Sequence, residues 1–122
     1  MKVGMLILIE NDLEKAIEFY KTMGLKLNFQ VKDKWAELEL SGTRIGLVPT
    51  TQTLPDRRSG IVIEVKDLSQ TYKDLKNKGL EFLNEPTTAV HGLMISIKDP
   101  GGNILDFYQP TPEKVKVKES RS

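Results

Sequence analysis

Hydrophobic and polar residues follow one pattern twice along this chain. In each copy, a short apolar segment leads to apolar residues at helical spacing and then to three segments of strand-like pattern. The helical segments run from Asp12 to Gly24 and from Asp67 to Gly79, each with an Asp-to-Gly separation of 12 residues (24 − 12 and 79 − 67). The copies are offset by 55 residues (67 − 12). A repeat of this length predicts two copies of one supersecondary unit.

The pattern predicts a strand, a helix and three strands in each copy. Aspartate favours the start of a helix, and glycine suits the left-handed residue that ends one. The predicted strands are residues 3–9, 25–31, 35–40 and 44–48 in the first copy, and 61–65, 80–83, 93–97 and 104–108 in the second. A longer loop is predicted at 84–92.

The fold class expected from this order is α+β, with two tandem βαβββ repeats. We expect one domain over residues 1–110, with repeat one at 1–50, a linker at 51–59 and repeat two at 60–110. Residues 111–122 are charged and lack a core pattern, which predicts a flexible tail. Each helix is expected to cover one face of its sheet, and the other faces of the curved, mixed sheets to enclose a cleft.

Composition excludes several classes of partner. The chain has 122 residues and a formal net charge of +1, so no bulk field attracts nucleic acid or an anionic membrane. It has no apolar run long enough to cross a bilayer. Absence of cysteine excludes disulfides and thiol chemistry and fits a cytoplasmic location.

Two motifs carry a resemblance to a known family. The segment from Asp12 to Gly24, with Phe19 and Tyr20 inside it, and the segment Lys98-Asp99-Pro100-Gly101-Gly102-Asn103 resemble the vicinal oxygen chelate superfamily. This superfamily includes glyoxalase I, fosfomycin-resistance enzymes, extradiol dioxygenases and bleomycin-resistance binding proteins. The resemblance implies the paired-repeat fold and a homodimer. It defines function only weakly, because one fold hosts many chemistries.

In metal-dependent members, the resemblance implies ligands at four strand positions. Here these positions are Met5, Gly46, Gly60 and Asp106, of which only Asp106 keeps a usual ligand. Catalytic zinc normally needs about three protein ligands and an open position. We therefore expect no metal and no cofactor.

Strand alternation predicts which residues share the cleft face with those positions. The expected cleft is apolar, widened by two glycines, with aromatic side chains and carboxylates. The candidate ligand-binding residues are Met5, Ile7, Trp35, Glu37, Gly46, Gly60, Glu64, Asp106 and Tyr108. Such a pocket suits a small organic molecule that is aromatic or cationic.

Three functions remain open at this stage. The first is a metal-free protein that binds a small organic molecule. The second is an enzyme, either a metal-dependent lyase or dioxygenase or a metal-free acid–base catalyst that uses Asp106 or His91, the sole histidine. The third is a module that binds another protein. Purely structural roles also remain open: Glu37, Glu39 and Glu64 can pair with Arg44 or Lys98, and Trp35 and Met5 can belong to the packing.

Overall fold

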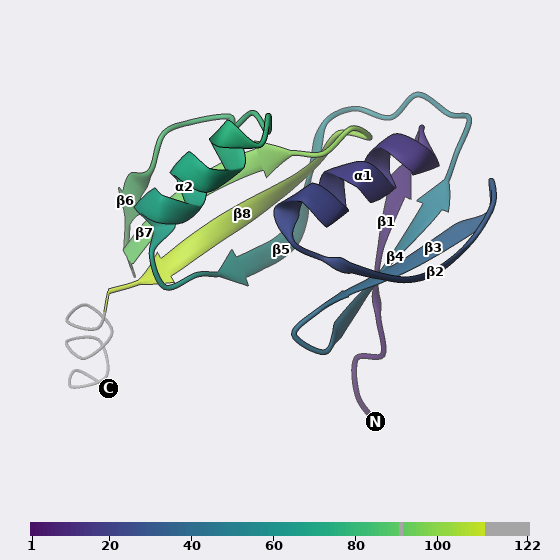
Figure 1. Cartoon of the computed structure of the whole chain (residues 1–122), viewed down its shortest axis with the longest axis horizontal. Helices are drawn as coiled ribbons and strands as arrows, with labels where there is room; N and C mark the ends of the chain where they lie inside the picture. Colours follow the sequence, from purple (N-terminus) through teal and green to yellow (C-terminus); the bar gives the residue numbers. More distant parts are fainter. Residues whose placement is uncertain (91, 112–122) are drawn as a thin grey trace. The chain divides into compact units, whose positions relative to one another are not determined.

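The computed structural model describes residues 1–90 and 92–111 and forms two compact units (Figure 1). One unit contains Met1–Ser59 together with Asp99–Asn103, and the other contains Gly60–Lys98 and, among the described residues, 104–111. In the described residues, each unit has one α-helix and a four-stranded sheet. The expected α+β class with two βαβββ repeats is therefore confirmed.

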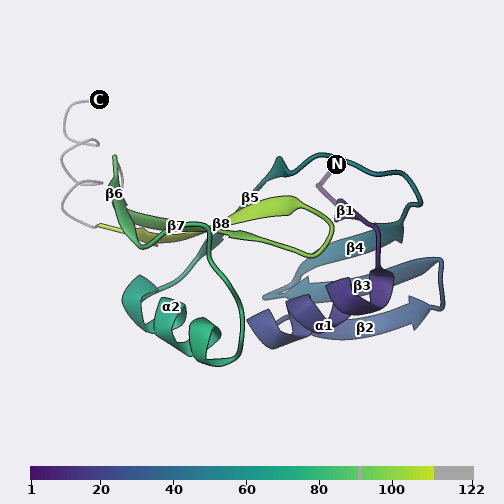
Figure 2. The same ribbon diagram turned by 90° about the horizontal axis from the view of Figure 1, so that it is seen from above.

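The first sheet has the strand order β1-β4-β3-β2. β1 runs parallel to β4, and the remaining neighbours are antiparallel. The elements are β1 (Leu6–Glu10), α1 (Leu13–Met23), β2 (Lys26–Val31), β3 (Trp35–Leu40) and β4 (Thr43–Pro49). Figure 2 shows α1 lying along one face of this sheet.

Helix α1 begins and ends where the sequence predicts. The Asp12 side chain accepts a hydrogen bond from the Lys15 N–H at 3.1 Å, which caps the helix. Gly24 ends it with a φ of 120° and donates its N–H to the Tyr20 carbonyl at 3.2 Å. The residues facing the sheet are Leu13, Ala16, Ile17 and Tyr20, all of them buried.

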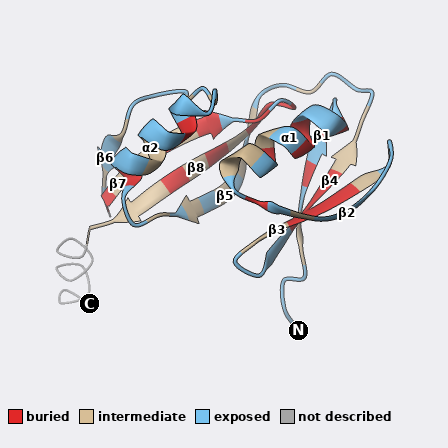
Figure 3. Ribbon diagram, viewed as in Figure 1, coloured by how far each residue is buried: buried red, intermediate tan, exposed pale blue. Residues whose placement is uncertain are grey.

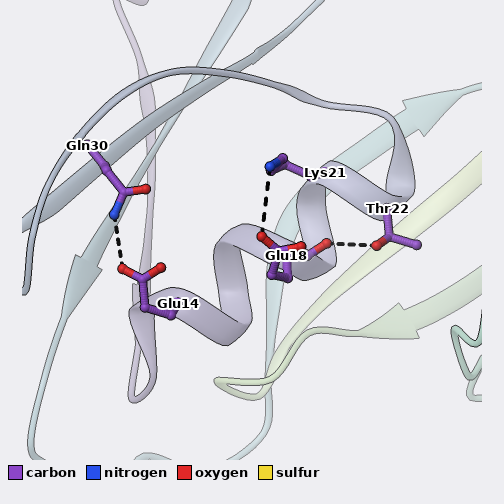
Figure 4. A network of polar contacts seen from close by, with 5 residues as sticks. All are labelled: Glu14, Glu18, Lys21, Thr22 and Gln30. Carbon is purple, nitrogen blue, oxygen red and sulfur yellow. Dashed lines mark hydrogen bonds and ion pairs between the residues drawn. The ribbon is translucent and has the colours of Figure 1, made fainter.

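The outer side of α1 carries polar contacts instead (Figure 4). Gln30 of β2 donates its side-chain amide to Glu14 at 2.9 Å. Farther along the helix, Lys21 lies 3.8 Å from the Glu18 carboxylate, and the Thr22 hydroxyl donates to the Glu18 carbonyl at 2.8 Å. These contacts are exposed, so the apolar face of the helix contributes more to stability than they do.

The second sheet has the strand order β5-β8-β7-β6. Its elements are β5 (Arg57–Glu64), α2 (Leu68–Asn77), β6 (Thr87–Ala89), β7 (Gly92–Lys98) and β8 (Asn103–Pro110). Helix α2 buries Leu68 and Leu75. The Phe82 ring lies 5.0 Å from the Tyr72 ring of α2 and 6.1 Å from the Phe107 ring of β8, and so joins the helix to the sheet.

Three boundaries differ from the sequence prediction. Residues 80–83 form only an isolated bridge, between Phe82 and Ile97, while the strand β6 lies inside the predicted loop 84–92. Strand β5 begins at Arg57, within the predicted linker 51–59, because the Arg57 N–H bonds to the Gly102 carbonyl at 2.8 Å. The predicted tail, from residue 112, and His91 lie outside the described residues.

The core of each unit lies between its helix and its sheet (Figure 3). The buried strand residues on these helix-facing sides include Leu8, Leu38, Ile45, Leu47, Ile95, Ile97, Leu105 and Phe107. Alternation therefore predicted the core side of β3, β4 and β8 correctly. Ile61 and Ile63 of β5, also expected in the core, are only half-buried. Among the described residues, no helix has the length and apolar character needed to cross a membrane.

Candidate ligand-binding face and a buried carboxylate cluster

The face of the first sheet that points away from α1 exposes an apolar surface. Strand register places Ile7 beside Gly46, Phe29 beside Glu37 and Val31 beside Trp35. The large side chains Ile7, Ile9, Phe29 and Val31 are between 42% and 57% exposed. We call this surface, formed by Ile7, Ile9, Phe29, Val31, Trp35 and Glu37, the open face. Exposed apolar residues gathered in one place are typical of interaction sites.

Trp35 lies directly over Gly46 in the open face. A Cβ atom added at Gly46 would lie 2.7 Å from the Trp35 Cζ2 atom and 3.0 Å from the Met5 sulfur. The expectation that Gly46 widens a cleft is therefore wrong, because the indole ring occupies the space that the glycine leaves. Gly46 instead lets the ring lie flat against β4.

Replacing Gly46 with alanine tests this packing. The added methyl group should displace the indole ring and lower the free energy of unfolding by about 1–3 kcal/mol. Trp35 is the sole tryptophan, so its fluorescence emission reports its own exposure and should shift to longer wavelength. An unshifted spectrum with unchanged stability would show that the ring does not rest on Gly46.

Glu37 is buried in the open face and has polar partners. The Asn28 side-chain amide donates to Glu37 Oε2 at 3.0 Å, and Arg44 Nη1 lies 3.9 Å from Oε1. On the same strand, Glu39 lies opposite Lys26. The pairing of Glu37 with Arg44, one of the alternatives from the sequence, is present. The Glu37 carboxylate of the open face therefore already has polar partners.

The second sheet carries the remaining candidate residues on the face away from its core. Asp106 of β8 accepts a hydrogen bond from the Ser96 hydroxyl at 2.5 Å. Tyr108 lies opposite Met94 and is half-buried. On β5, Glu64 is exposed, and Gly60 has a φ of 80° with open space where a side chain would begin. The space next to Gly60 is therefore open, whereas the Trp35 ring occupies the space next to Gly46.

The residues at the four family positions do not fit a metal ion. In the first unit, the Met5 thioether packs against Gly46, which offers no side chain. In the second unit, Gly60 likewise offers no ligand, and Asp106 already accepts the Ser96 hydroxyl. In the described part of the chain, no group of three or more His, Cys, Asp or Glu side chains could hold a metal.

The first unit also contains a buried polar cluster that the sequence analysis missed. Its members, Glu10, Tyr20, Asp99 and Asn103, are at most 3% exposed. The Tyr20 hydroxyl donates to Asp99 Oδ2 at 2.6 Å. The Asn103 side-chain amide donates to Glu10 Oε2 at 3.0 Å and to Asp99 Oδ2 at 3.1 Å. The cluster thus joins β1 and α1 to the turn at 99–103.

Burial changes the acid–base properties of this cluster. Desolvation raises the pKa of Glu10 from 4.5 to about 9, and the hydrogen bond and negative charge of Asp99 add to the shift. Desolvation and the Asp99 charge also raise the pKa of the Tyr20 hydroxyl above its usual range. This environment favours the protonated form of the Glu10 side chain. The signal in the sequence was the alternation Leu6, Leu8, Glu10, which places Glu10 on the helix side of β1.

The fold has two βαβββ units, and the turn Asp99–Asn103 belongs to the first of them. Comparisons with known proteins identify the class of protein that this fold defines. Residues 2–107 match the Glyoxalase/Bleomycin resistance protein/Dioxygenase superfamily, and the chain belongs to it. The uncharacterized protein YetH of Bacillus subtilis is 27% identical over 116 residues, which cover 85% of this chain and 94% of YetH.

Solved structures share the fold. The fosfomycin resistance protein FosX from Listeria monocytogenes superposes with a TM-score of 0.79 at 15% identity, over 96% of this chain and 97% of FosX. TnmS3, an antibiotic binding protein from Streptomyces sp. CB03234, superposes with a TM-score of 0.72 at 24% identity, over 90% of this chain and 98% of TnmS3. At these identities the likeness establishes the fold alone.

Proposed function

We propose that this chain is a metal-free protein that binds a small, largely apolar organic molecule on the open face of the first sheet. The observation that carries the proposal is the gathering of four exposed apolar side chains around Trp35. Burying apolar surface contributes about 25 cal/mol per Å², so a ligand that covered these side chains would gain most of its affinity from them. The antibiotic-binding relative TnmS3 supports a binding role for this fold.

The charges favour a flat, uncharged ligand over a cationic one. A cation would need an unpaired carboxylate, but Glu37 already has Asn28 and Arg44 as partners. The exposed part of the Trp35 ring offers a surface for stacking, which contributes about 0.5–1.5 kcal/mol beyond burial. The polar groups around Glu37 can then orient a hydroxyl or carbonyl group of the ligand.

A fluorescence titration tests this function. The probe is 2-naphthol, a neutral aromatic molecule, and N-methylquinolinium is its cationic counterpart. We expect 2-naphthol to change Trp35 emission and bind more tightly than the cation. Ile7→Thr should weaken binding about tenfold, which corresponds to about 1.4 kcal/mol.

The matched control is Val90→Thr, which makes a similar change at an exposed residue outside the open face. Equal affinities for Ile7→Thr and Val90→Thr would contradict the proposed location of the site. No saturable binding of either probe would contradict the function itself.

The working form that we propose is a cytoplasmic homodimer. The absence of cysteine and the family's usual assembly support it. Sedimentation of the sample used in the titration gives the oligomeric state. A protein that stays monomeric at the concentrations of the titration would contradict the dimer without affecting the proposed ligand.

A further inference from the structure

The two carboxylates of the buried cluster have unequal numbers of hydrogen-bond donors. Asp99 accepts from the Tyr20 hydroxyl and from the Asn103 side chain through Oδ2, and from the N–H groups of Gly101 and Asn103 through Oδ1. Glu10 accepts a hydrogen bond from the Asn103 side chain through Oε2. A hydrogen bond with the Gly101 backbone also lowers the pKa of Glu10, but desolvation and Asp99 raise it more. The other Glu10 oxygen, Oε1, is buried and has no side-chain partner. This environment stabilises a charged Asp99 and disfavours a charged Glu10.

The cation that the described contacts place beside Glu10 donates to backbone carbonyls and not to the carboxylate. From β5, the Arg57 guanidinium donates to the Ile9 carbonyl at 2.8 Å and to the Gly101 carbonyl at 3.0 Å. From α1, the facing titratable group is the neutral Tyr20 hydroxyl. After β4, Thr50 contributes only its backbone N–H, to the Glu10 carbonyl. Among the described residues, no salt bridge to Glu10 or Asp99 appears.

The turn has no space in which to relax around a second charge. A Cβ atom added at Gly101 would meet Glu10 Oε1 and would lie 3.0 Å from the Ile9 carbonyl oxygen. A water molecule that could solvate the carboxylate needs a polar cavity of its own size. The close packing of Gly101 on Glu10 leaves no such room on that side.

We propose that Glu10 carries a proton in the folded first unit at neutral pH, and that this proton holds the turn Asp99–Asn103 against β1. Without this proton, two charged carboxylates would lie next to each other in one buried site. Paired carboxylates in such a site normally share one proton, because two adjacent negative charges repel each other. Loss of the proton at alkaline pH therefore frees the turn, which connects β7 to β8. The contact between this turn and β1 is therefore pH-sensitive, and it is intact at neutral pH.

The sign of the pH dependence follows from where the proton binds. Between 4.5, the ordinary pKa of the glutamate, and about 9, its value in the folded chain, folding takes up one proton at Glu10. Stability contributed by this group is fully present below that range and falls as the pH rises through it. The unfolding equilibrium constant should increase by up to tenfold per pH unit from this group alone.

The test compares the full chain with Glu10→Gln by urea denaturation across this pH range. Glutamine keeps the shape and can donate one N–H in place of the proton. The slope of the free energy of unfolding against pH gives the number of protons bound on folding. We expect this number to differ by about one between the two proteins. Glu18→Gln, at an exposed residue of α1, should follow the wild type. Equal slopes for wild type and Glu10→Gln would overturn the proposal.

Two NMR measurements cover the remaining outcomes. At alkaline pH, the Gly101 and Asn103 amides should exchange faster in the wild type than in Glu10→Gln, and equal exchange would overturn release of the turn. If Glu10→Gln does not fold, the proposal is tested on the wild type alone. The side-chain carboxyl signals of ¹³C-labelled glutamate are then followed as a function of pH. One signal with an alkaline midpoint supports the proposal, and acidic midpoints for all of them overturn it.

Discussion

Replacing Asp99 with alanine is expected to lower the free energy of unfolding by about 4 kcal/mol, because buried donors that lose their acceptor cost about 1–3 kcal/mol each. The donors left behind are the Tyr20 hydroxyl and the N–H groups of Gly101 and Asn103. Part of this cost is offset, because Glu10 loses a negative neighbour. The expected loss is a large fraction of the stability of a small domain.

Urea denaturation at neutral pH measures this loss. The control is Asp74→Ala, which removes an exposed aspartate whose side chain accepts a hydrogen bond from Gln70 on the same helix. This variant should change stability by about 0.5 kcal/mol or less. If Asp99→Ala loses no more than Asp74→Ala, the cluster does not stabilise the first unit in the way its geometry implies.

Replacing Gly92 with alanine is expected to cost about 3 kcal/mol, through overpacking and backbone strain together. Gly92 begins β7 opposite Pro110, with a φ of 153°. An added Cβ atom would meet the Gln109 carbonyl oxygen and would lie 2.9 Å from the Thr111 nitrogen. Both contacts are with backbone, which cannot turn aside as a side chain can.

The matched control for Gly92 is Gly79→Ala. Gly79 also has a positive φ, of 93°, but nothing lies within 4 Å of an added Cβ atom. The free energy of unfolding of Gly79→Ala should therefore fall by only about 1–2 kcal/mol, the cost of placing a side chain on a left-handed residue. Thermal or urea unfolding of both variants separates the two effects. Equal losses would mean that the contact with β8 adds nothing.

Local signals in the sequence were sufficient for the helices and most strands. Asp12 and Gly24 act on the helix that they flank, so their effect can be read without knowing the rest of the fold. Alternation likewise predicted that Glu37 and Trp35 share a face. These features depend on residues within a few positions of one another.

Features that depend on distant residues were missed. Strand β5 begins early because Arg57 bonds to Gly102, 45 positions along the chain (102 − 57). The sequence predicts open space at Gly46, because nothing in its own strand indicates that Trp35 lies over it. Alternation places Glu10 on the helix side of β1, but its burial cannot be predicted locally, because a carboxylate is rarely buried and its partners come from residues 99–103.

The inclusion of Asp99–Asn103 in the first unit has a consequence for synthesis on the ribosome. Domains generally fold in the order in which they emerge, beginning with the N-terminal one. Here, the first repeat emerges with Tyr20 and Glu10 already in place but without the acceptor and donor that satisfy them. We expect its core to stay incomplete until Asn103 has left the exit tunnel, so the first unit completes its folding only after most of the second repeat has been synthesised.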